Sequence, residues 1–404
     1  MKILVINAGS SSIKLQIMSM ADEELLASCL IERIGGEGSL CRCVFRQGTP
    51  AERMIIERRQ PIADHQEGVR LALRLLTDPG QTIFSDGREL LAVGHRVAHG
   101  GEDFHKPCLI DERVLEAITA NVPLAPLHNP ANLNGIRVAM ELLPGVSQVA
   151  VFDTAFHQTM PPRAYHYALP SRFYQENRLR RYGFHGTSHQ YVAGECARLM
   201  ARPLDELNLI TIHLGNGSSM TAIEKGNSVD TTLGMTPLEG LIMGTRCGDI
   251  DPSIPTFLAR VRGMGLEEID AILNQESGLK GICGLNDIRD IHQAIAKSDA
   301  AAALALEMLT YRIRRYIGAY MAVLGRVDAI VFTAGIGEND AVVREKSLAG
   351  LENFGIILSQ EKNRQKLAEA REIGGAGAVR LWVIPTNEEL AIARHALALV
   401  HGDR

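Results

Sequence analysis

Four side chains that could carry charge chemistry lie in four separate segments, each glycine-rich or at the end of an apolar run. Arg96 lies in GHRVAHGG, Asp153 in VFDTAFH, His185 in RRYGFHGTSH and Arg246 in MGTRCGDIDP. A lone histidine or acid at the end of a strand is more often structural than catalytic, so no single segment decides the function. Together, two arginines, a histidine and an acid suit a reaction between negatively charged groups, such as phosphoryl transfer.

Two turns rich in glycine and serine share one pattern. The segments LVINAGSSSIKL (4–15) and ITIHLGNGSSMTAI (210–223) each contain a strand, a polar residue, Gly and Ser, and a second strand. Two copies about half a chain apart indicate two related lobes, each beginning with a β-hairpin. The alternative is that strand–Gly–Ser turns recur by chance.

The first of these turns offers groups that suit phosphate and a metal ion. Backbone N–H groups near Gly9 and the hydroxyls that follow can approach phosphate oxygens without side-chain bulk. Lys14 adds positive charge, and the amide oxygen of Asn7 suits Mg²⁺ or its water shell. A plain hairpin turn needs only a glycine and one polar residue, so three consecutive serines favour a binding site.

Signatures of several other enzyme classes are absent from the sequence. The chain contains no G-x-x-x-x-G-K-[ST], no G-x-G-x-x-G after a strand, no H-E-x-x-H and no G-x-S-x-G. His185 and His189 have the i, i+4 spacing of a metal pair, but no third ligand is near them in the sequence. A metallohydrolase is therefore a remote alternative.

The elements that must position these residues alternate along the chain. The Ala/Leu-rich segment 299–324 predicts a long helix, and IPTNEELAIAR predicts the start of another. Apolar runs that end in Gly, Asp, Thr or Pro predict strands at 92–97, 147–154, 207–214, 328–335 and 379–386. This alternation predicts an α/β protein, in which polar residues at strand ends can meet in one crevice.

Composition restricts the remaining classes of function. The 404 residues predict two or three domains, and the net charge of −5 argues against a nucleic-acid partner. No apolar run approaches the roughly 20 residues that cross a bilayer, so we expect no membrane partner. The seven cysteines include no C-x-x-C pair. We therefore expect reduced thiols in a cytoplasmic protein, with neither a disulfide framework nor a zinc site.

Nine segments resemble the signature segments of the acetate kinases, in the acetate/propionate/butyrate kinase family of the sugar kinase–Hsp70–actin superfamily. They are INAGSSSIK, GHRVAHGG, APLHNP, VFDTAFH, RRYGFHGTSH, HLGNGSS, GTRCGDIDP, FTAGIGEN and PTNEE, in the family's order from residue 3 to about 394. The resemblance implies two duplicated ribonuclease H-like (actin-like ATPase) βββαβαβα lobes with a cleft between them. It implies an N-terminal lobe of residues 1–152 with helix 389–404, and a nucleotide-binding C-terminal lobe of residues 153–388.

The resemblance also implies an activity and its partners. These are reversible in-line transfer of a phosphoryl group from ATP to acetate, giving acetyl phosphate and ADP, with Mg²⁺ or Mn²⁺ as cofactor. A small carboxylate and ATP are then the expected ligands, and the expected assembly is a homodimer. Asp153, His185 and Arg246 are the expected catalytic residues, and Asn7 and Glu388 the expected metal ligands.

Further residues carry over as expected contacts to the two substrates. Arg96 is expected to pair with the substrate carboxylate, which is already deprotonated near pH 7 and needs little general-base help; we therefore expect Asp153 to act through the metal or Arg96. Phosphate and nucleotide contacts are expected from Ser10, Ser12, Lys14, His213, Leu214, Gly215, Asn216, Gly217, Asp287, Ile288, Arg289, Gly335, Ile336, Gly337, Glu338 and Asn339.

The acyl group is expected to lie in a small apolar pocket near His128, with Ala98, Leu127, Phe184 and Pro237 as its walls. Acetate kinases often carry Val where this chain has Ala98, and a smaller residue enlarges the pocket. We therefore expect propionate to be used as well, and a propionate kinase is an alternative. Neutral packing variation at Ala98 is the other interpretation.

Two other functions within the superfamily compete with this one. A sugar kinase would need several hydrogen-bonding partners for its substrate in place of Arg96 and a small apolar pocket. A non-catalytic ATP-dependent switch or chaperone would not need Arg96, Asp153, His185 and Arg246 together. Both alternatives are therefore less favoured than a carboxylate kinase.

Overall fold

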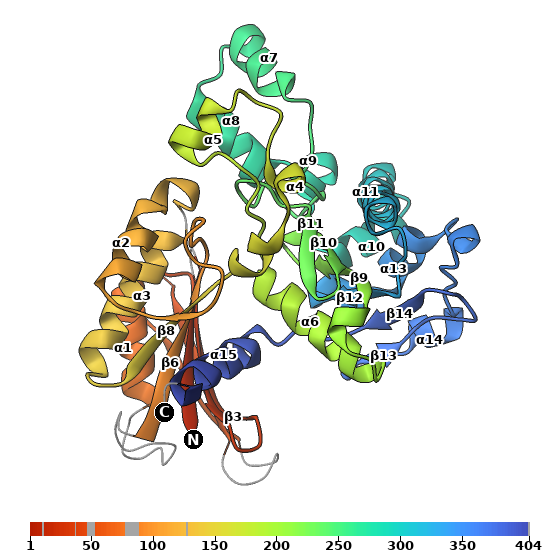
Figure 1. Cartoon of the computed structure of the whole chain (residues 1–404). Coiled ribbons are helices and arrows are strands. Elements are labelled where there is room, and N and C mark those ends of the chain that lie inside the picture. The colour runs from red at the N-terminus through yellow and green to blue at the C-terminus, as the bar shows by residue number, and fades with distance from the viewer. Residues whose placement is uncertain (10–11, 37, 47–52, 77–88, 127, 403–404) are drawn as a thin grey trace. The chain divides into compact units, whose positions relative to one another are not determined.

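The computed structural model describes the chain except for residues 10–11, 37, 47–52, 77–88, 127 and 403–404. The described chain divides into two compact units, residues 1–155 with 387–404 and residues 156–386. Each unit contains one sheet with helices packed against it (Figure 1). The predicted lobe boundaries assign Asp153 and Glu388 to the second lobe. In the structure both residues belong to the first unit, because each adjoins an element that is part of its sheet or packs on it.

The sheet of the first unit has the strand order β5-β4-β3-β2-β1-β6-β8-β7. Its strands β1 to β5 form antiparallel hairpins, whereas β1, β6 and β8 run parallel to one another. The carboxyl ends of these three parallel strands therefore meet at one edge. The strands are β1 (Lys2–Ala8), β2 (Ser12–Ser19), β3 (Glu24–Glu32), β4 (Leu40–Arg46), β5 (Arg53–Arg59), β6 (Leu90–Val97), β7 (Cys108–Leu109) and β8 (Ser147–Phe152).

Helices cover both faces of this sheet. The helices are α1 (His65–Leu76), α2 (Glu112–Ala120), α3 (Asn129–Leu142) and α15 (Glu388–Gly402). α1 and α3 share a core with β1 to β4, while α15 packs on β6 and β1 (Figure 1). Gly94 in β6 permits this approach, because a Cβ there would lie 2.6 Å from a side-chain carbon of Ile392. α15 thus brings Glu388 to the end of the sheet although 231 residues of the second unit precede it in sequence, between 156 and 386.

The sheet of the second unit repeats this arrangement. Its order is β11-β10-β9-β12-β14-β13, with β9 to β11 antiparallel and with β12 parallel to both β9 and β14. The strands are β9 (Asn208–Leu214), β10 (Ser218–Glu224), β11 (Asn227–Thr231), β12 (Ala329–Thr333), β13 (Arg371–Glu372) and β14 (Arg380–Val383). The order β11-β10-β9-β12-β14 corresponds to β3-β2-β1-β6-β8 in the first unit, so the predicted duplication is confirmed, and the hairpins β1–β2 and β9–β10 are its equivalent first elements.

Helices pack on both faces of the second sheet as well. α6 shares a core with β9 and β12 on one face, and α11 lies against β9 and β10 on the other. The predicted helix 299–324 is confirmed as α11, capped by Asp299, whose carboxylate accepts hydrogen bonds from the N–H groups of Ala301 and Ala302. The helices are α4 (Pro162–Tyr165), α5 (Arg172–Asn177), α6 (Gly186–Leu199), α7 (Ser253–Arg262), α8 (Leu266–Ala271), α9 (Gly278–Cys283), α10 (Ile288–Ala296), α11 (Ala300–Leu324), α12 (Ala334–Asn339), α13 (Ala341–Leu348) and α14 (Gln360–Arg364). Across the described residues, every helix is too short or too polar to span a membrane.

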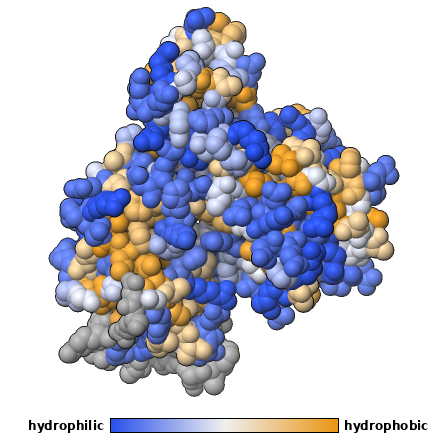
Figure 2. All heavy atoms as spheres, viewed as in Figure 1, coloured by the Kyte–Doolittle hydropathy of each residue, from blue (hydrophilic) through white to orange (hydrophobic). Residues whose placement is uncertain are grey.

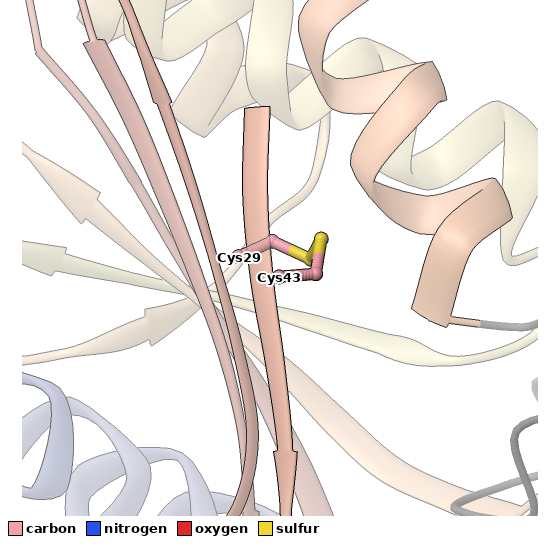
Figure 3. Close-up of a disulfide and its surroundings, with 2 residues drawn as sticks. All are labelled: Cys29 and Cys43. Carbon is pink, nitrogen blue, oxygen red and sulfur yellow. A yellow bond between two sulfur atoms is a disulfide. The ribbon is translucent and has the colours of Figure 1, made fainter. Parts of the chain in front are cut away.

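One prediction about the cysteines is wrong. The structure joins Cys29 of β3 and Cys43 of β4 in a disulfide within the core of the first unit (Figure 3). The two residues are 14 apart in sequence, but the β3–β4 register places them directly opposite each other, with their Cα atoms 4.0 Å apart. Closeness in sequence singles out Cys41 and Cys43 instead; these two share one face of β4, but roughly 7 Å of extended strand separates their Cα atoms, more than a disulfide usually spans. Cys41, Cys108, Cys196, Cys247 and Cys283 are unpaired thiols.

The disulfide predicts the number of titratable thiols. Protein purified without reductant and denatured should titrate as five thiols, since the five cysteines outside the pair are free. After reduction it should titrate as seven. The Cys29→Ala/Cys43→Ala variant should unfold at lower urea concentration, by about 3 kcal/mol for a loop of this size in the chain-entropy account.

A matched control comes from the same strand. Cys41 is also fully buried in β4 but unpaired. Cys41→Ala should therefore destabilise the protein equally with and without reductant, whereas the double variant should differ from the wild type mainly without reductant. Seven thiols in the unreduced protein would contradict the pairing.

Candidate active site

Arg96 organises a polar cluster at the carboxyl end of the first sheet. Its Nε and Nη2 donate to Oδ1 and Oδ2 of Asp153 at 3.1 and 2.5 Å, and its Nη1 donates to Oδ1 of Asn7 at 3.2 Å. Arg96 is the penultimate residue of β6, Asp153 follows β8 and Asn7 lies in β1, so the three parallel strands deliver one residue each. Three of the five guanidinium N–H groups are used in this way, and the described residues leave two for a ligand.

Two acidic residues of α15, Glu388 and Glu389, add negative charge to this cluster. Burial alone would lower the pKa of Arg96, but Asp153, Glu388 and Glu389 more than offset it, and the pKa is raised. Burial raises the pKa of Glu388, and the neighbouring Glu389 raises it further. Lys14, expected to face phosphates, forms an ion pair of 2.8 Å with Glu389. Three carboxylates thus surround two cations, which leaves one negative charge in excess.

Two buried asparagines of α3 fix the loops beside the cluster. The amide oxygen of Asn132 accepts from the N–H of Ala98 at 3.0 Å, and its NH₂ donates to the carbonyl of Ala8 at 2.8 Å. Asn129 bonds in the same way to both backbone groups of His99. Ala98, two residues after Arg96, is buried, and His128 is the N-cap residue of α3.

Two predicted site residues lie outside the described residues. These are Ser10 of the first hairpin and Leu127 of the expected acyl pocket. Ser12 begins β2, and its carbonyl accepts from the N–H of Gly9 at 2.8 Å, which closes the first hairpin. The other walls of the expected pocket are divided between the units: Ala98 belongs to the first, and Phe184 and Pro237 belong to the second.

His185 and Arg246 converge on the tip of the second hairpin. A Cβ placed on Gly217 would lie 3.4 Å from Nε2 of His185 and 3.5 Å from Nη1 of Arg246. The absence of a side chain at Gly217 therefore keeps open a space that both basic groups border. This space is the size of a small group, and it is lined by donors that suit an anion.

Arg246 differs from Arg96 in its partners. Its Nη1 donates to the carbonyl of Pro237 at 3.0 Å and lies 3.8 Å from the sulfur of Met243, and no carboxylate of the described residues pairs with it. Burial lowers the pKa of Arg246. A half-buried guanidinium without a carboxylate partner favours an anionic ligand.

Backbone conformation and stacking position the ring of His185. The residue is the N-cap of α6 with φ of 57°, a left-handed conformation, and its Nδ1 lies 2.9 Å from Oγ of Ser219. Its ring stacks on His213, with centroids 4.3 Å apart and planes 19° apart. The preceding residue, Phe184, is buried in a small cluster with Leu233 and Met243.

A cavity of about 790 Å³ adjoins the second hairpin inside the second unit. This volume is typical of sites for small-molecule ligands. Of the predicted nucleotide contacts, nine line the cavity: Leu214, Gly215, Asn216, Asp287, Ile288, Arg289, Gly335, Ile336 and Asn339. His213 and Gly217 do not line it, and they lie beside His185 instead.

The residues of the segment 335–339 lie on different faces of a short helix, and only some of them line the cavity. It forms α12 rather than an open turn, so Gly335, Ile336 and Asn339 share the face toward the cavity. Gly337 is buried on the other side. The carboxylate of Glu338, expected to contact the nucleotide, instead accepts from the N–H of Thr386 at 3.1 Å.

The cavity lining contains two ion pairs and several residues that the sequence analysis did not identify. Asp287 caps α10 and forms a 2.6 Å ion pair with Arg289, whose hydrogen bonds lower the pKa of Asp287 to about 2. His292 and Asp340 form another pair at 2.6 Å. The unpredicted lining residues are Ser218, Ile242, Met243, Gly244, Leu279, Asn286, His292, Leu309, Asp340, Ala341 and Val342. Most are apolar wall residues, which carry no chemical signature; Gly244 lies within the singled-out segment MGTRCGDIDP.

Known proteins resemble this chain over its whole length. The sequence profile of the Acetokinase family matches residues 2–394. An acetate kinase of Desulfotalea psychrophila is 57% identical and one of Oleidesulfovibrio alaskensis is 52% identical, each over 100% of both chains. The crystal structure of Porphyromonas gingivalis acetate kinase has a TM-score of 0.92 at 41% identity, covering 99% of both chains. A propionate kinase structure from Francisella tularensis has a TM-score of 0.89 at 40% identity, covering 98% of both.

Proposed function

The chain belongs to the acetokinase family, and on that premise we propose how its residues share the reaction. The reaction is phosphoryl transfer between ATP and the carboxylate of acetate, with acetyl phosphate and ADP as products. We propose that the first unit receives the carboxylate at Arg96 and that the second unit holds the nucleotide and the transferring phosphoryl group. The single observation that carries this division is the convergence of His185 and Arg246, a guanidinium that no carboxylate of the described residues pairs with, beside a cavity of nucleotide size.

The chemistry requires positioning and charge neutralisation more than proton transfer. A carboxylate oxygen attacks the γ-phosphorus, a new P–O bond forms, and the bond to the β-phosphate oxygen breaks in line with it. The attacking group resembles Glu, whose ordinary pKa is about 4.3, so it is deprotonated near neutral pH. Both reactants are anions, and the protein must offset their repulsion.

Arg96 is the residue proposed to bind the carboxylate. Asp153 grips its Nε and Nη2 side, so the guanidinium plane is fixed while two N–H groups stay available. Asp153 therefore acts by orienting Arg96 and not as a general base. This role accounts for a fully buried acid in a reaction that releases no proton.

His185 and Arg246 are proposed to stabilise the transferring phosphoryl group. Their nitrogens border the space at Gly217, where the transition state would place negative charge on the equatorial oxygens. The hairpin tip adds backbone N–H groups, and the cavity next to it would hold the rest of the nucleotide. His128 stays a proposed contact of the substrate, and Ser12 a proposed contact of the phosphates.

The first cluster suits a divalent cation. Its donors are hard oxygens, Oδ1 of Asn7 and the carboxylate of Glu388, and the cluster has one more carboxylate than cations. No group of three or more His, Cys, Asp or Glu among the described residues forms a complete cage. That fits Mg²⁺, which takes one or two protein ligands and completes its shell with water and phosphate oxygens. When bound, the ion would neutralise phosphate charge; we propose Mg²⁺, with Mn²⁺ as a substitute.

We also propose a homodimer that works in the cytoplasm, where ATP is available. Large apolar side chains stay exposed on the second unit: Phe257, Val261 and Leu266 around α7 are 58%, 62% and 77% exposed. Hydrophobic colour reaches the surface at the end of this unit that carries α7 (Figure 2). Light scattering should give twice the chain mass of 44.1 kDa; a monomer at micromolar concentration would contradict the dimer.

A hydroxamate assay for acyl phosphate tests the reaction. Purified protein with Mg-ATP should form hydroxamate from acetate, and the product should require ATP, metal and protein together. His185→Gln and Arg246→Gln should each lower kcat by about 100-fold or more, since each removes one donor from the transition state. Folded wild-type protein that binds ATP but forms no acyl phosphate from acetate, propionate or butyrate would contradict the proposal.

The size of residue 98 should set the choice between acetate and propionate. Ala98→Val adds two carbons near Arg96, and a buried methylene is worth about 0.8 kcal/mol, roughly fourfold. The ratio of kcat/KM for propionate over acetate should fall about fourfold or more, and Ala98→Gly should not lower it. The measurement is the same assay with both acids. An unchanged ratio in Ala98→Val would make Ala98 a neutral packing residue.

A further inference from the structure

Hydrogen bonds link four side chains in series, from Thr211 in the interior of the second unit to His185; this series is called the hydrogen-bond chain. The Oγ1 of Thr211 lies 2.7 Å from Nδ1 of His189, and Nε2 of His189 lies 2.7 Å from Oγ of Ser219. The same Ser219 oxygen lies 2.9 Å from Nδ1 of His185. Thr211, His189 and Ser219 are completely buried.

Secondary structure fixes the members of this chain relative to one another. His185 is the N-cap residue of α6, and His189 lies in the first turn of that helix. Thr211 lies in β9 and Ser219 in β10, the two strands of the second hairpin. α6 packs on β9, so the hydrogen bonds run from the helix to the sheet and back. The chain ends at the ring whose Nε2 borders the space at Gly217.

Proton counting limits this chain to two arrangements. A serine hydroxyl has one proton, so Ser219 can donate to only one of its two ring nitrogens and must accept from the other. Burial lowers the pKa of His189 well below its ordinary value, so this ring is neutral and carries one N–H. The three hydrogen bonds that join the four groups therefore all run in the same direction.

The two directions give His185 opposite properties. In one, Thr211 donates to His189, His189 donates to Ser219, and Ser219 donates to Nδ1 of His185. A neutral His185 then carries its proton on Nε2 and can donate it to an anion. In the other direction Nδ1 carries the proton, and Nε2 of the neutral ring turns a lone pair toward the anion.

We propose that Thr211, His189 and Ser219 are positioning residues that hold His185 as the Nε2–H tautomer, which donates to the transferring phosphoryl group. The inference rests on the role proposed above for His185. It also gives a role to His189, the second histidine of GFHGTSH. The sequence offers this residue as one of a metal pair with His185, but hydroxyl groups occupy both of its ring nitrogens.

Nitrogen NMR on the resting protein reads the tautomer directly. Protein labelled with ¹⁵N-histidine should show His185 protonated at Nε2, with its signals assigned by their loss in His185→Gln. Thr211→Val is close to isosteric and removes only the hydroxyl donor, and Ser219→Ala removes the last donor. Both should convert His185 to a mixture of tautomers, whereas Thr211→Ser and Ser219→Thr, which keep the hydroxyl, should retain the Nε2–H form.

Steady-state kinetics give a second readout, which a purely structural role would not produce. Thr211→Val should lower kcat by about 10-fold or more while KM for ATP and acetate changes less than about threefold, because the lost interaction is made in the transition state. Thr211→Ser should restore kcat. At position 189, Gln places an NH₂ near the site of Nε2 and should keep more activity than Asn, which is too short to reach Ser219.

Two results would overturn the inference. One is a wild-type His185 protonated at Nδ1 only, or at both nitrogens, in the resting protein at the pH of the assay. The other is a folded Thr211→Val variant with unchanged tautomer and unchanged kcat. The tautomer is observed without substrates, so it tests this inference even if the acyl phosphate assay fails. An active wild type with the Nδ1–H tautomer would contradict this inference and leave the proposed function intact.

Discussion

The bidentate ion pair between Arg96 and Asp153 is the interaction on which the first half of the site depends. A buried guanidinium is costly unless it is paired and hydrogen-bonded, and Asp153 provides both in one geometry. The parallel strands β6 and β8 place the two residues side by side, and β1 adds Asn7. The duplicated topology thus serves the chemistry, because only neighbouring parallel strands deliver their carboxyl ends to one point.

The two arginines of the proposed site have opposite electrostatic surroundings. Arg96 is held by a carboxylate and lies in a cluster with an excess of negative charge, which suits a metal ion and a weakly bound monoanion. Within the described part of the chain Arg246 has carbonyl and sulfur partners only, so we propose that its charge is available to a more highly charged phosphoryl group. This difference supports the proposal that the first unit receives the carboxylate and that the second unit holds the phosphates.

Sequence reasoning predicted the features that depend on local pattern. The two Gly/Ser hairpins, the helix that becomes α11, and the polar residues at the strand ends all follow from period and spacing. It did not predict the pairing of Cys29 with Cys43, because strand register is a non-local property. Sequence reasoning did not predict that Glu338 bonds to Thr386 while its neighbours in α12 face the cavity, or that Lys14 pairs with Glu389. Helix faces and ion pairs are set only when the elements pack. Apolar walls of the cavity such as Leu279 and Leu309 look like any core residue in sequence.

The most direct test of this account is the equilibrium binding of radiolabelled acetate in the presence of Mg-ADP. Arg96→Gln removes the proposed ligand, and Asp153→Asn removes the group that orients it. Hydrogen bonds to charged groups contribute about 1.5–3 kcal/mol, so each variant should bind acetate about 10-fold or more weakly, while ADP affinity, set by the second unit, should stay within about twofold. Acetate binding of wild-type strength in both variants would contradict the claim that the Asp153-anchored Arg96 receives the substrate.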